Sequence, residues 1–148
     1  MQLKNKWVIT TDSLCEGITA DKDERGRIIL YAEDDAARSV MDSWLMIQEA
    51  RNDEIESGFY AEDDPEDIPY HMKPKDLAAM GKLASEGTAA QIIAFWDKHP
   101  DMDDSGFGWE PAQDFIDGRK AIWTQGGGHL EGRRIQDLEV IDENEISN

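Results

Sequence analysis

The sequence predicts an α+β fold: a single domain in which an antiparallel sheet from N- and C-terminal strands packs against three to four helices. β-branched and aromatic residues concentrate towards both ends of the chain, and apolar residues at helical spacing fill its middle. Its 148 residues suit one domain with a real core, and no repeat or composition break divides them. We therefore expect residues 1–148 to form one domain, with 142–148 as a frayed tail.

The N-terminal part predicts two strands. Residues 4–11, KNKWVITT, have a β-branched and aromatic centre, and residues 27–33, RIILYAE, share that composition. A polar turn at 21–26, DKDERG, separates them, and Leu14–Ala20 is long enough for another short strand. This order favours a hairpin or a short meander.

The longest expected helix runs from Asp35 to about Glu54, with Asp34 or Asp35 as its N-cap. An advance of 100° per residue places apolar side chains on one face and acidic side chains on the opposite face. The apolar set is Ala37, Val40, Met41, Trp44, Ile47 and Ile55, and the acidic set is Asp35, Asp42, Glu49 and Asp53. An ordinary solvated face is the commoner explanation of such an acidic stripe.

Glu56–Lys73 is expected to be an acidic loop on an extended path, because Pro65 and Pro69 disfavour a helix there. Aromatic and aliphatic residues interrupt its acidic sequence and are expected to pin it to the protein body. They are Phe59, Tyr60, Ile68 and Tyr70. Tyrosines at such positions also suit an interface, although packing is their commoner role.

Three further helices are expected in the middle of the chain, with prolines, glycines or a threonine cap at their ends. They cover residues 75–85, 89–98 and 112–117. A loop at 101–110 joins the last two, and Gly118 ends the last one. The C-terminal part then returns to strands at 120–125, 129–135 and 138–141, with a turn at Gly126–Gly128.

The composition limits the partners that the chain can have. It carries 33 acidic and 15 basic residues, a formal charge of −18, so it should repel nucleic acid and anionic membranes and attract basic surfaces. The single Cys15 cannot form an intramolecular disulfide. The N-terminus lacks the apolar part of a signal peptide, and no apolar run approaches the ~20 residues that span a bilayer. We expect a soluble, cytoplasmic protein.

Most of the negative charge falls into two blocks. Residues 34–72 contain twelve acidic and two basic residues, and residues 101–118 contain six acidic residues and no basic one. Together they account for sixteen of the eighteen net negative charges. Within the first block, Glu49–Asp67 has nine carboxylates opposed only by Arg51. Charge that served solubility alone would be more scattered, so we expect the two blocks to share one face.

A possible metal site lies in the second block. Asp101–Gly106 has oxygen-bearing side chains at positions one, three and five and glycine at six, which resembles the first half of an EF-hand loop. The resemblance ends at position twelve, where Ala112 replaces the bidentate glutamate. A solvated turn is the commoner use of Asp, Ser and Gly. A calcium- or other metal-binding module stays open as an alternative, but no metal or cofactor is expected.

The sequence contains no catalytic signature, so we do not expect an enzyme. His71, His99 and His129 belong to no helical zinc motif, and the chain has only one cysteine, so the cysteine pair that zinc deaminases need beside such a histidine is absent. Nothing supplies a base to activate Ser13 or Cys15 as a nucleophile. A small hydrolytic enzyme that uses His99 or His129 with nearby carboxylates stays open as a second alternative.

A comparison of charge densities limits what the long helix can imitate. Duplex DNA carries one charge per ~1.7 Å of its axis. The acidic face of the helix offers four carboxylates over roughly 27 Å, or about one per 7–9 Å. The charge density of the helix alone is therefore too low to imitate a duplex. To reach that density, Glu54–Asp67 and Asp101–Asp117 would have to lie beside the helix.

In size and charge blocks the chain resembles small acidic DNA-mimic inhibitors, such as phage anti-restriction and anti-CRISPR proteins, and the nuclease-immunity proteins of bacterial toxin systems. The resemblance covers no motif and therefore transfers no functional residue. It implies inhibition of an antiviral defence system or a role in toxin immunity, by steric and electrostatic occlusion of a basic, nucleic-acid-binding protein or nuclease complex, without direct contact to nucleic acid or membrane.

The residues expected to contact this partner are the acidic residues of the helix, of the loop and of the second block, with one aromatic anchor. They are Asp35, Asp42, Glu49, Asp53, Glu54, Glu56, Glu62, Asp63, Asp64, Glu66, Asp67, Asp101, Asp103, Asp104 and Tyr60.

Overall fold

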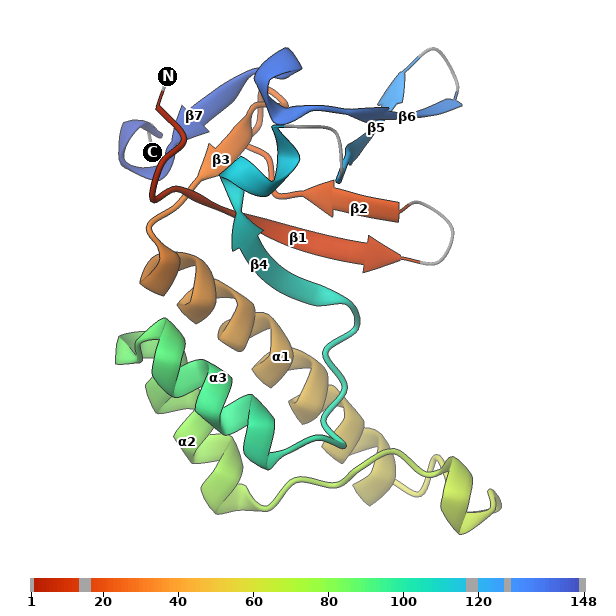
Figure 1. Ribbon diagram of the computed structural model, residues 1–148. Helices are drawn as coiled ribbons and strands as arrows, with labels where there is room; N and C mark the ends of the chain where they lie inside the picture. The colour runs from red at the N-terminus through yellow and green to blue at the C-terminus, as the bar shows by residue number, and fades with distance from the viewer. Residues whose placement is uncertain (1, 14–16, 117–119, 127–128, 147–148) are drawn as a thin grey trace. The chain divides into compact units, whose positions relative to one another are not determined.

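The computed structural model describes residues 2–13, 17–116, 120–126 and 129–146 (Figure 1). Within these residues the chain is a small mixed α/β fold with three α-helices, antiparallel strand pairs and one parallel pair. The chain divides into two compact units. We call residues 1–36 with 106–148 the strand unit, and residues 37–105 the helical unit. Whether they behave as one domain stays a prediction.

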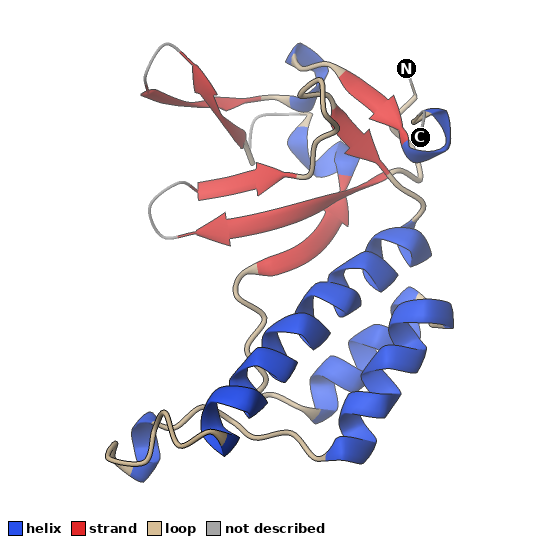
Figure 2. Cartoon of the chain, turned by 180° about the vertical axis from the view of Figure 1, so that it is seen from behind, coloured by secondary structure: helices blue, strands red, loops and turns tan. Residues whose placement is uncertain are grey.

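The strand unit contains a three-stranded antiparallel sheet in the order β2-β1-β4 (Figure 2). Its strands are β1 (Trp7–Ser13), β2 (Gly17–Ala20) and β4 (Phe107–Pro111). Thr10 of β1 lies opposite Ala20 on one side and Gly108 on the other. The short strand that Leu14–Ala20 allowed is thus β2, although Leu14, Cys15 and Glu16 lie outside the described residues.

Two further strand pairs complete the strand unit. β3 (Ile28–Leu30) pairs in parallel with β7 (Val140–Asp142), and β5 (Ile122–Gly126) pairs antiparallel with β6 (His129–Arg133). The expected C-terminal hairpin is therefore confirmed, while Gly127 and Gly128 of its turn lie outside the described residues.

The prediction of one antiparallel sheet shared by both ends of the chain is wrong in its pairing, because the two ends meet in a parallel pair. The third antiparallel strand is β4, of which all but Pro111 lies in the segment predicted as a loop. Gly106 makes this strand possible. Its φ is +77°, its carbonyl accepts a hydrogen bond from the Asp12 amide at 3.0 Å, and a Cβ there would lie 2.2 Å from the Asp12 oxygen.

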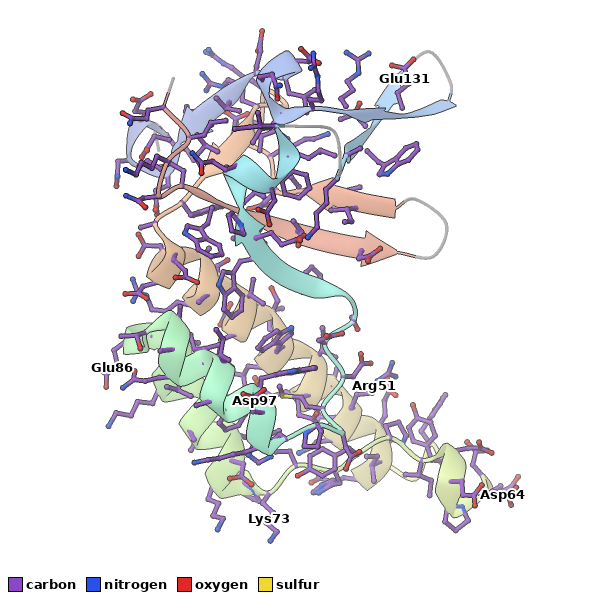
Figure 3. All side chains as sticks on the ribbon, in the orientation of Figure 1. Arg51, Asp64, Lys73, Glu86, Asp97 and Glu131 are labelled. Carbon is purple, nitrogen blue, oxygen red and sulfur yellow. The ribbon has the colours of Figure 1, made fainter. Side chains whose placement is uncertain are left out.

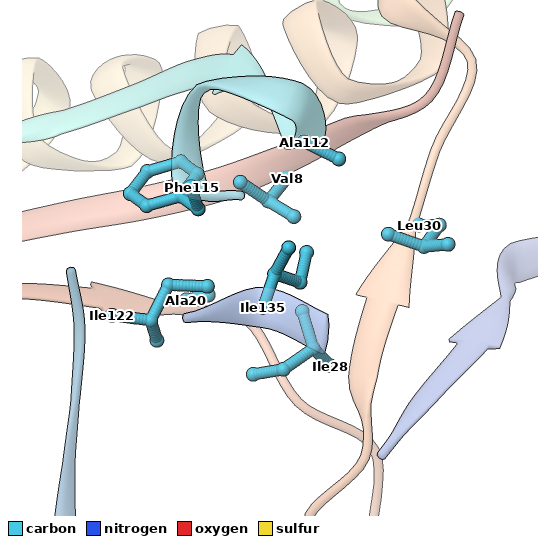
Figure 4. Packing of buried hydrophobic residues seen from close by; sticks show 8 residues of the cluster. All are labelled: Val8, Ala20, Ile28, Leu30, Ala112, Phe115, Ile122 and Ile135. Carbon is cyan, nitrogen blue, oxygen red and sulfur yellow. The ribbon is translucent and has the colours of Figure 1, made fainter. Parts of the chain in front are cut away.

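The core of the strand unit collects buried side chains from segments far apart in the sequence (Figure 4). They are Val8, Ala20, Ile28, Leu30, Ala112, Phe115, Ile122 and Ile135. Ala112 and Phe115 come from a 3₁₀ turn at Ala112–Phe115, where a short helix over 112–117 was expected; Asp117 and Gly118 lie outside the described residues. A second 3₁₀ turn at Ile135–Asp137 places Ile135 in this core, where the sequence predicts the end of a strand.

The helical unit contains most of α1 (Glu33–Glu56), together with α2 (Pro74–Glu86) and α3 (Ala89–Lys98). Pro74 starts α2, and Thr88 starts α3 through a capping box with Gln91. The predictions of α2 and α3 are thus confirmed. The Trp44 and Trp96 rings pack with their centroids 5.1 Å apart and join α1 to α3.

The start of α1 differs from the prediction. The helix begins at Glu33, so Asp34 and Asp35 lie inside its first turn and not at the N-cap position. The Ala32 amide, which precedes the helix, donates instead to Glu143 Oε2 at 2.8 Å. Glu143 lies in the expected C-terminal tail, where Glu143–Glu145 forms a 3₁₀ turn capped by Asp142. No helix among the described residues is both long and apolar enough to cross a membrane.

Candidate functional site

The acidic loop, which we define as residues 58–73, begins at a sharp turn after α1. The Phe59 amide donates to the Glu54 carbonyl at 3.1 Å, and the Gly58 amide donates to the Ile55 carbonyl at 3.2 Å. With Gly58 at φ +85°, this is the Schellman arrangement that ends many helices. It extends α1 to Glu56, two residues beyond the prediction, and directs the chain away from the helix axis.

Two buried amide side chains of α1 hold the far end of the loop. Asn52 Nδ2 donates to the Met72 carbonyl at 2.9 Å, and the Met72 amide donates back to Asn52 Oδ1 at 3.1 Å. Gln48 Nε2 donates to the Tyr70 carbonyl at 2.8 Å and to Asn52 Oδ1 at 3.0 Å. Gln48 and Asn52 are 1% and 5% exposed; the bonds of Asn52 are buried, and the bond from Gln48 to the Tyr70 carbonyl is partly buried. The loop is therefore fastened to α1 where it returns.

A second group of contacts holds the near end of the loop. The Tyr60 hydroxyl donates to Glu54 Oε2 at 2.7 Å, and Arg51 Nη1 donates to the same oxygen at 3.2 Å and to the Tyr60 hydroxyl at 3.3 Å. The hydrogen bond from Tyr60 lowers the pKa of Glu54, and the same bond raises the pKa of Tyr60. Glu56 Oε1 lies 3.0 Å from His71 Nε2 and links the two ends.

The outer part of the loop carries exposed carboxylates. They belong to Glu62, Asp63, Asp64, Glu66 and Asp67. Figure 3 shows Asp64 at the outer tip of the loop, just before a 3₁₀ turn at Pro65–Asp67. Within the described residues, none of these five carboxylates forms an ion pair or a side-chain hydrogen bond. The expected packing of the interrupting residues is realised only in part, because Phe59 is 72% exposed and Ile68 is 36% exposed.

Part of the second acidic block lies beside the loop. Arg51 Nη2 is 3.7 Å from Asp103 Oδ2, so the same guanidinium that holds Glu54 and Tyr60 also faces Asp103. A cavity of about 330 Å³ lies between these segments. It is lined by Gln48, Arg51, Tyr60, Asp67, Pro69, Tyr70, Asp101 and Asp103. The helical unit thus brings carboxylates of both blocks to one cavity.

The other expected contact residues are more dispersed. Asp42, Glu49 and Asp53 are exposed on α1, whereas Asp104 is half-buried. Asp35 lies in the strand unit, where its carboxyl is close to that of Glu143. Burial of Glu143 and, to a smaller extent, its contact with Asp35 raise the pKa of Glu143. Asp35 therefore faces another carboxyl group.

The residues of the two alternative functions have local roles. The Asp103 carboxylate accepts hydrogen bonds from the Ser105 amide at 2.7 Å and from the Ser105 hydroxyl at 3.2 Å, which closes a turn. His99 ends α3 and stacks on Phe95, with ring centroids 4.3 Å apart. His129 lies in β6. Among the described residues, no three His, Cys, Asp or Glu side chains come together as a metal site.

Sequence reasoning missed three features of this site, namely the Gly58 turn, the buried Gln48–Asn52 pair and the exposure of Phe59. A glycine two residues after an amphipathic helix was a readable signal for the first. No protein-family model, curated protein or solved structure matches the chain. The geometry of the acidic loop is therefore the basis on which a function is inferred.

Proposed function

We propose that the chain is an acidic inhibitor or interaction protein that blocks a basic, nucleic-acid-binding surface of a partner protein by steric and electrostatic occlusion, in the manner of DNA-mimic proteins. The observation that carries this proposal is the cluster of five exposed carboxylates on a loop that is fastened at both ends. Such a cluster pairs with the lysines and arginines that line a phosphate-binding groove.

The fastening of the loop supports binding in a physical way. A flexible acidic segment would lose conformational freedom when it docks, and that loss weakens association. Here the hydrogen bonds of Asn52 and Tyr60 restrict the loop before any partner arrives. The helical unit as a whole has sixteen acidic and six basic residues, so it also attracts a basic surface over distance.

The proposal is tested by capture of partners from a host lysate on the immobilised full chain, at about 50 mM and about 300 mM salt. We expect a basic nucleic-acid-binding protein to be captured at low salt and released at high salt. A loop variant that replaces Glu62, Asp63, Asp64, Glu66 and Asp67 by the corresponding amides should lose this capture.

A matched control separates the loop from net charge. Five exposed carboxylates of the strand unit are replaced in the same way in the control variant. They are Asp12, Glu24, Asp114, Glu139 and Glu145. The control variant has the same net charge as the loop variant and should still capture the partner. Equal loss in both variants would show that only net charge matters, and unchanged capture by the loop variant would refute the proposal.

A further inference from the structure

Phe59 is the most exposed large apolar side chain among the described residues, at 72%. It lies three residues before the five carboxylates of the acidic loop. An exposed phenylalanine is unfavourable in water, and aromatic side chains are enriched among the anchors of protein interfaces. The position of this ring near the carboxylates of the same loop therefore indicates a surface with an apolar centre and a charged rim, which is the usual composition of an interface.

The Phe59 ring is also held in place. Its amide is bonded to the Glu54 carbonyl in the turn that ends α1. Its ring meets the Tyr60 ring edge to face, with centroids 4.9 Å apart and an interplanar angle of 79°. The Tyr60 hydroxyl is in turn held by Glu54 and Arg51. An exposed aromatic ring is thus presented on a fixed support.

The spacing of the carboxylates identifies the polymer that the loop resembles. A backbone advances about 2.0 Å per residue in a 3₁₀ turn and up to about 3.5 Å when extended. Five carboxylates within residues 62–67 therefore have a mean spacing of about 2.5–4.4 Å along the chain. In a B-form duplex each strand carries a phosphate about every 3.4 Å of helix axis, and the two strands together carry one charge per ~1.7 Å. The spacing of the carboxylates along the loop therefore matches the axial charge spacing of one strand and is wider than that of a duplex.

Building on the proposed function, we propose that the loop imitates single-stranded nucleic acid, with its carboxylates in place of phosphates and Phe59 in place of a base. The partner surface is then a groove for single strands, because such grooves combine a basic track with aromatic side chains on which bases stack. Surfaces that bind duplexes contact phosphates and base edges in the grooves and have no need of such stacking side chains.

The inference is tested on the partner isolated by the capture experiment above. A 20-nucleotide oligo(dT) and a 20-base-pair duplex are compared, at equal phosphate concentration, as competitors for its complex with the full chain. We expect oligo(dT) to displace the chain at a concentration at least tenfold lower. Phe59→Ala should weaken binding about 5–150-fold, the range for loss of one stacked base. Met46→Ala removes another exposed apolar side chain, 65% exposed on α1, and should change binding less than twofold.

The possible outcomes separate the two proposals. Displacement by the duplex at equal or lower concentration, or equal binding by the Phe59→Ala and Met46→Ala variants, overturns the single-strand inference. If the loop variant still loses capture in that case, the proposed function stands. If no basic partner is captured, or if the loop variant captures it normally, both proposals fail. Thermal unfolding of each variant confirms that lost binding does not reflect lost folding.

Discussion

The replacement of Asn52 by alanine tests the claim that buried hydrogen bonds fasten the acidic loop. Asn52 is 5% exposed, donates to the Met72 carbonyl and accepts from the Met72 amide. Met72 itself is 0% exposed. Removal of the Asn52 amide therefore takes the hydrogen-bond partner from the Met72 amide and the Met72 carbonyl, and one acceptor from Gln48 Nε2. A buried polar group without a partner costs about 1–3 kcal/mol, so we expect a loss of about 2–4 kcal/mol after partial rehydration.

Urea denaturation followed by tryptophan fluorescence measures this loss in the free energy of unfolding. Asp53→Ala is the matched control, because Asp53 is the exposed neighbour on the same helix, and it should change stability by less than about 0.5 kcal/mol. Limited proteolysis supplies an independent measurement. The loop of the Asn52→Ala variant should be cleaved faster than that of the control, because its returning segment is no longer held.

Two results would refute this reasoning. A loss below about 1 kcal/mol for Asn52→Ala would mean that water replaces the hydrogen bonds without penalty. A large loss of stability with an unchanged rate of loop cleavage would mean that Asn52 supports the helical unit without fastening the loop. In either case the hydrogen bonds of Asn52 would not be what fastens the loop.

Gly106→Ala should lower the free energy of unfolding by more than about 2 kcal/mol. Gly26 has a similar φ of +80° but nothing within 4 Å of a Cβ, so Gly26→Ala should lower it by only about 1–2 kcal/mol. Urea denaturation compares the two variants. Burial is the main cause that raises the pKa of Glu143, so the protonated carboxyl stabilises the fold at acidic pH. This contribution is lost as the pH rises through the raised pKa of the folded state. Glu143→Gln should remove this fall in denaturation experiments from about pH 4 to pH 7. Tyr60→Phe should raise the pKa of Glu54, measured by carboxyl NMR titration, because it removes the hydrogen bond that lowers it.

The helices could be predicted because their signals are local. The apolar spacing of α1, the proline that opens α2 and the threonine that caps α3 lie within or next to the segments that they define. β4 could not be predicted in this way. Its five residues include a glycine and a proline, and they form a strand because β1 lies alongside them. Pairing between residues about 100 positions apart leaves no short-range signal.

The candidate site likewise has features with a local sequence signal and features that depend on the fold. Its charge was readable from composition, since the carboxylates of 62–67 are consecutive apart from Pro65. The fastening of the loop was not readable, because Gln48 and Asn52 resemble ordinary polar residues of an exposed helix face. They become buried only when Tyr70–Met72 returns over α1. The partner of a buried polar group depends on the fold and not on its neighbours in sequence.

The contrast between the charge of the loop and its fastening is the strongest argument that the loop has a function. Five neighbouring carboxylates repel one another, by about 1 kcal/mol for a pair 4 Å apart in water and less at physiological salt. A chain that needs only solubility can scatter such charges and avoid this repulsion. Here the carboxylates are consecutive in sequence apart from Pro65, and the buried bonds of Asn52 and the contacts of Tyr60 hold both ends of the loop that carries them. A basic partner surface would relieve this repulsion. The relief of the unfavourable electrostatic free energy of the unbound loop would therefore add to the free energy of binding.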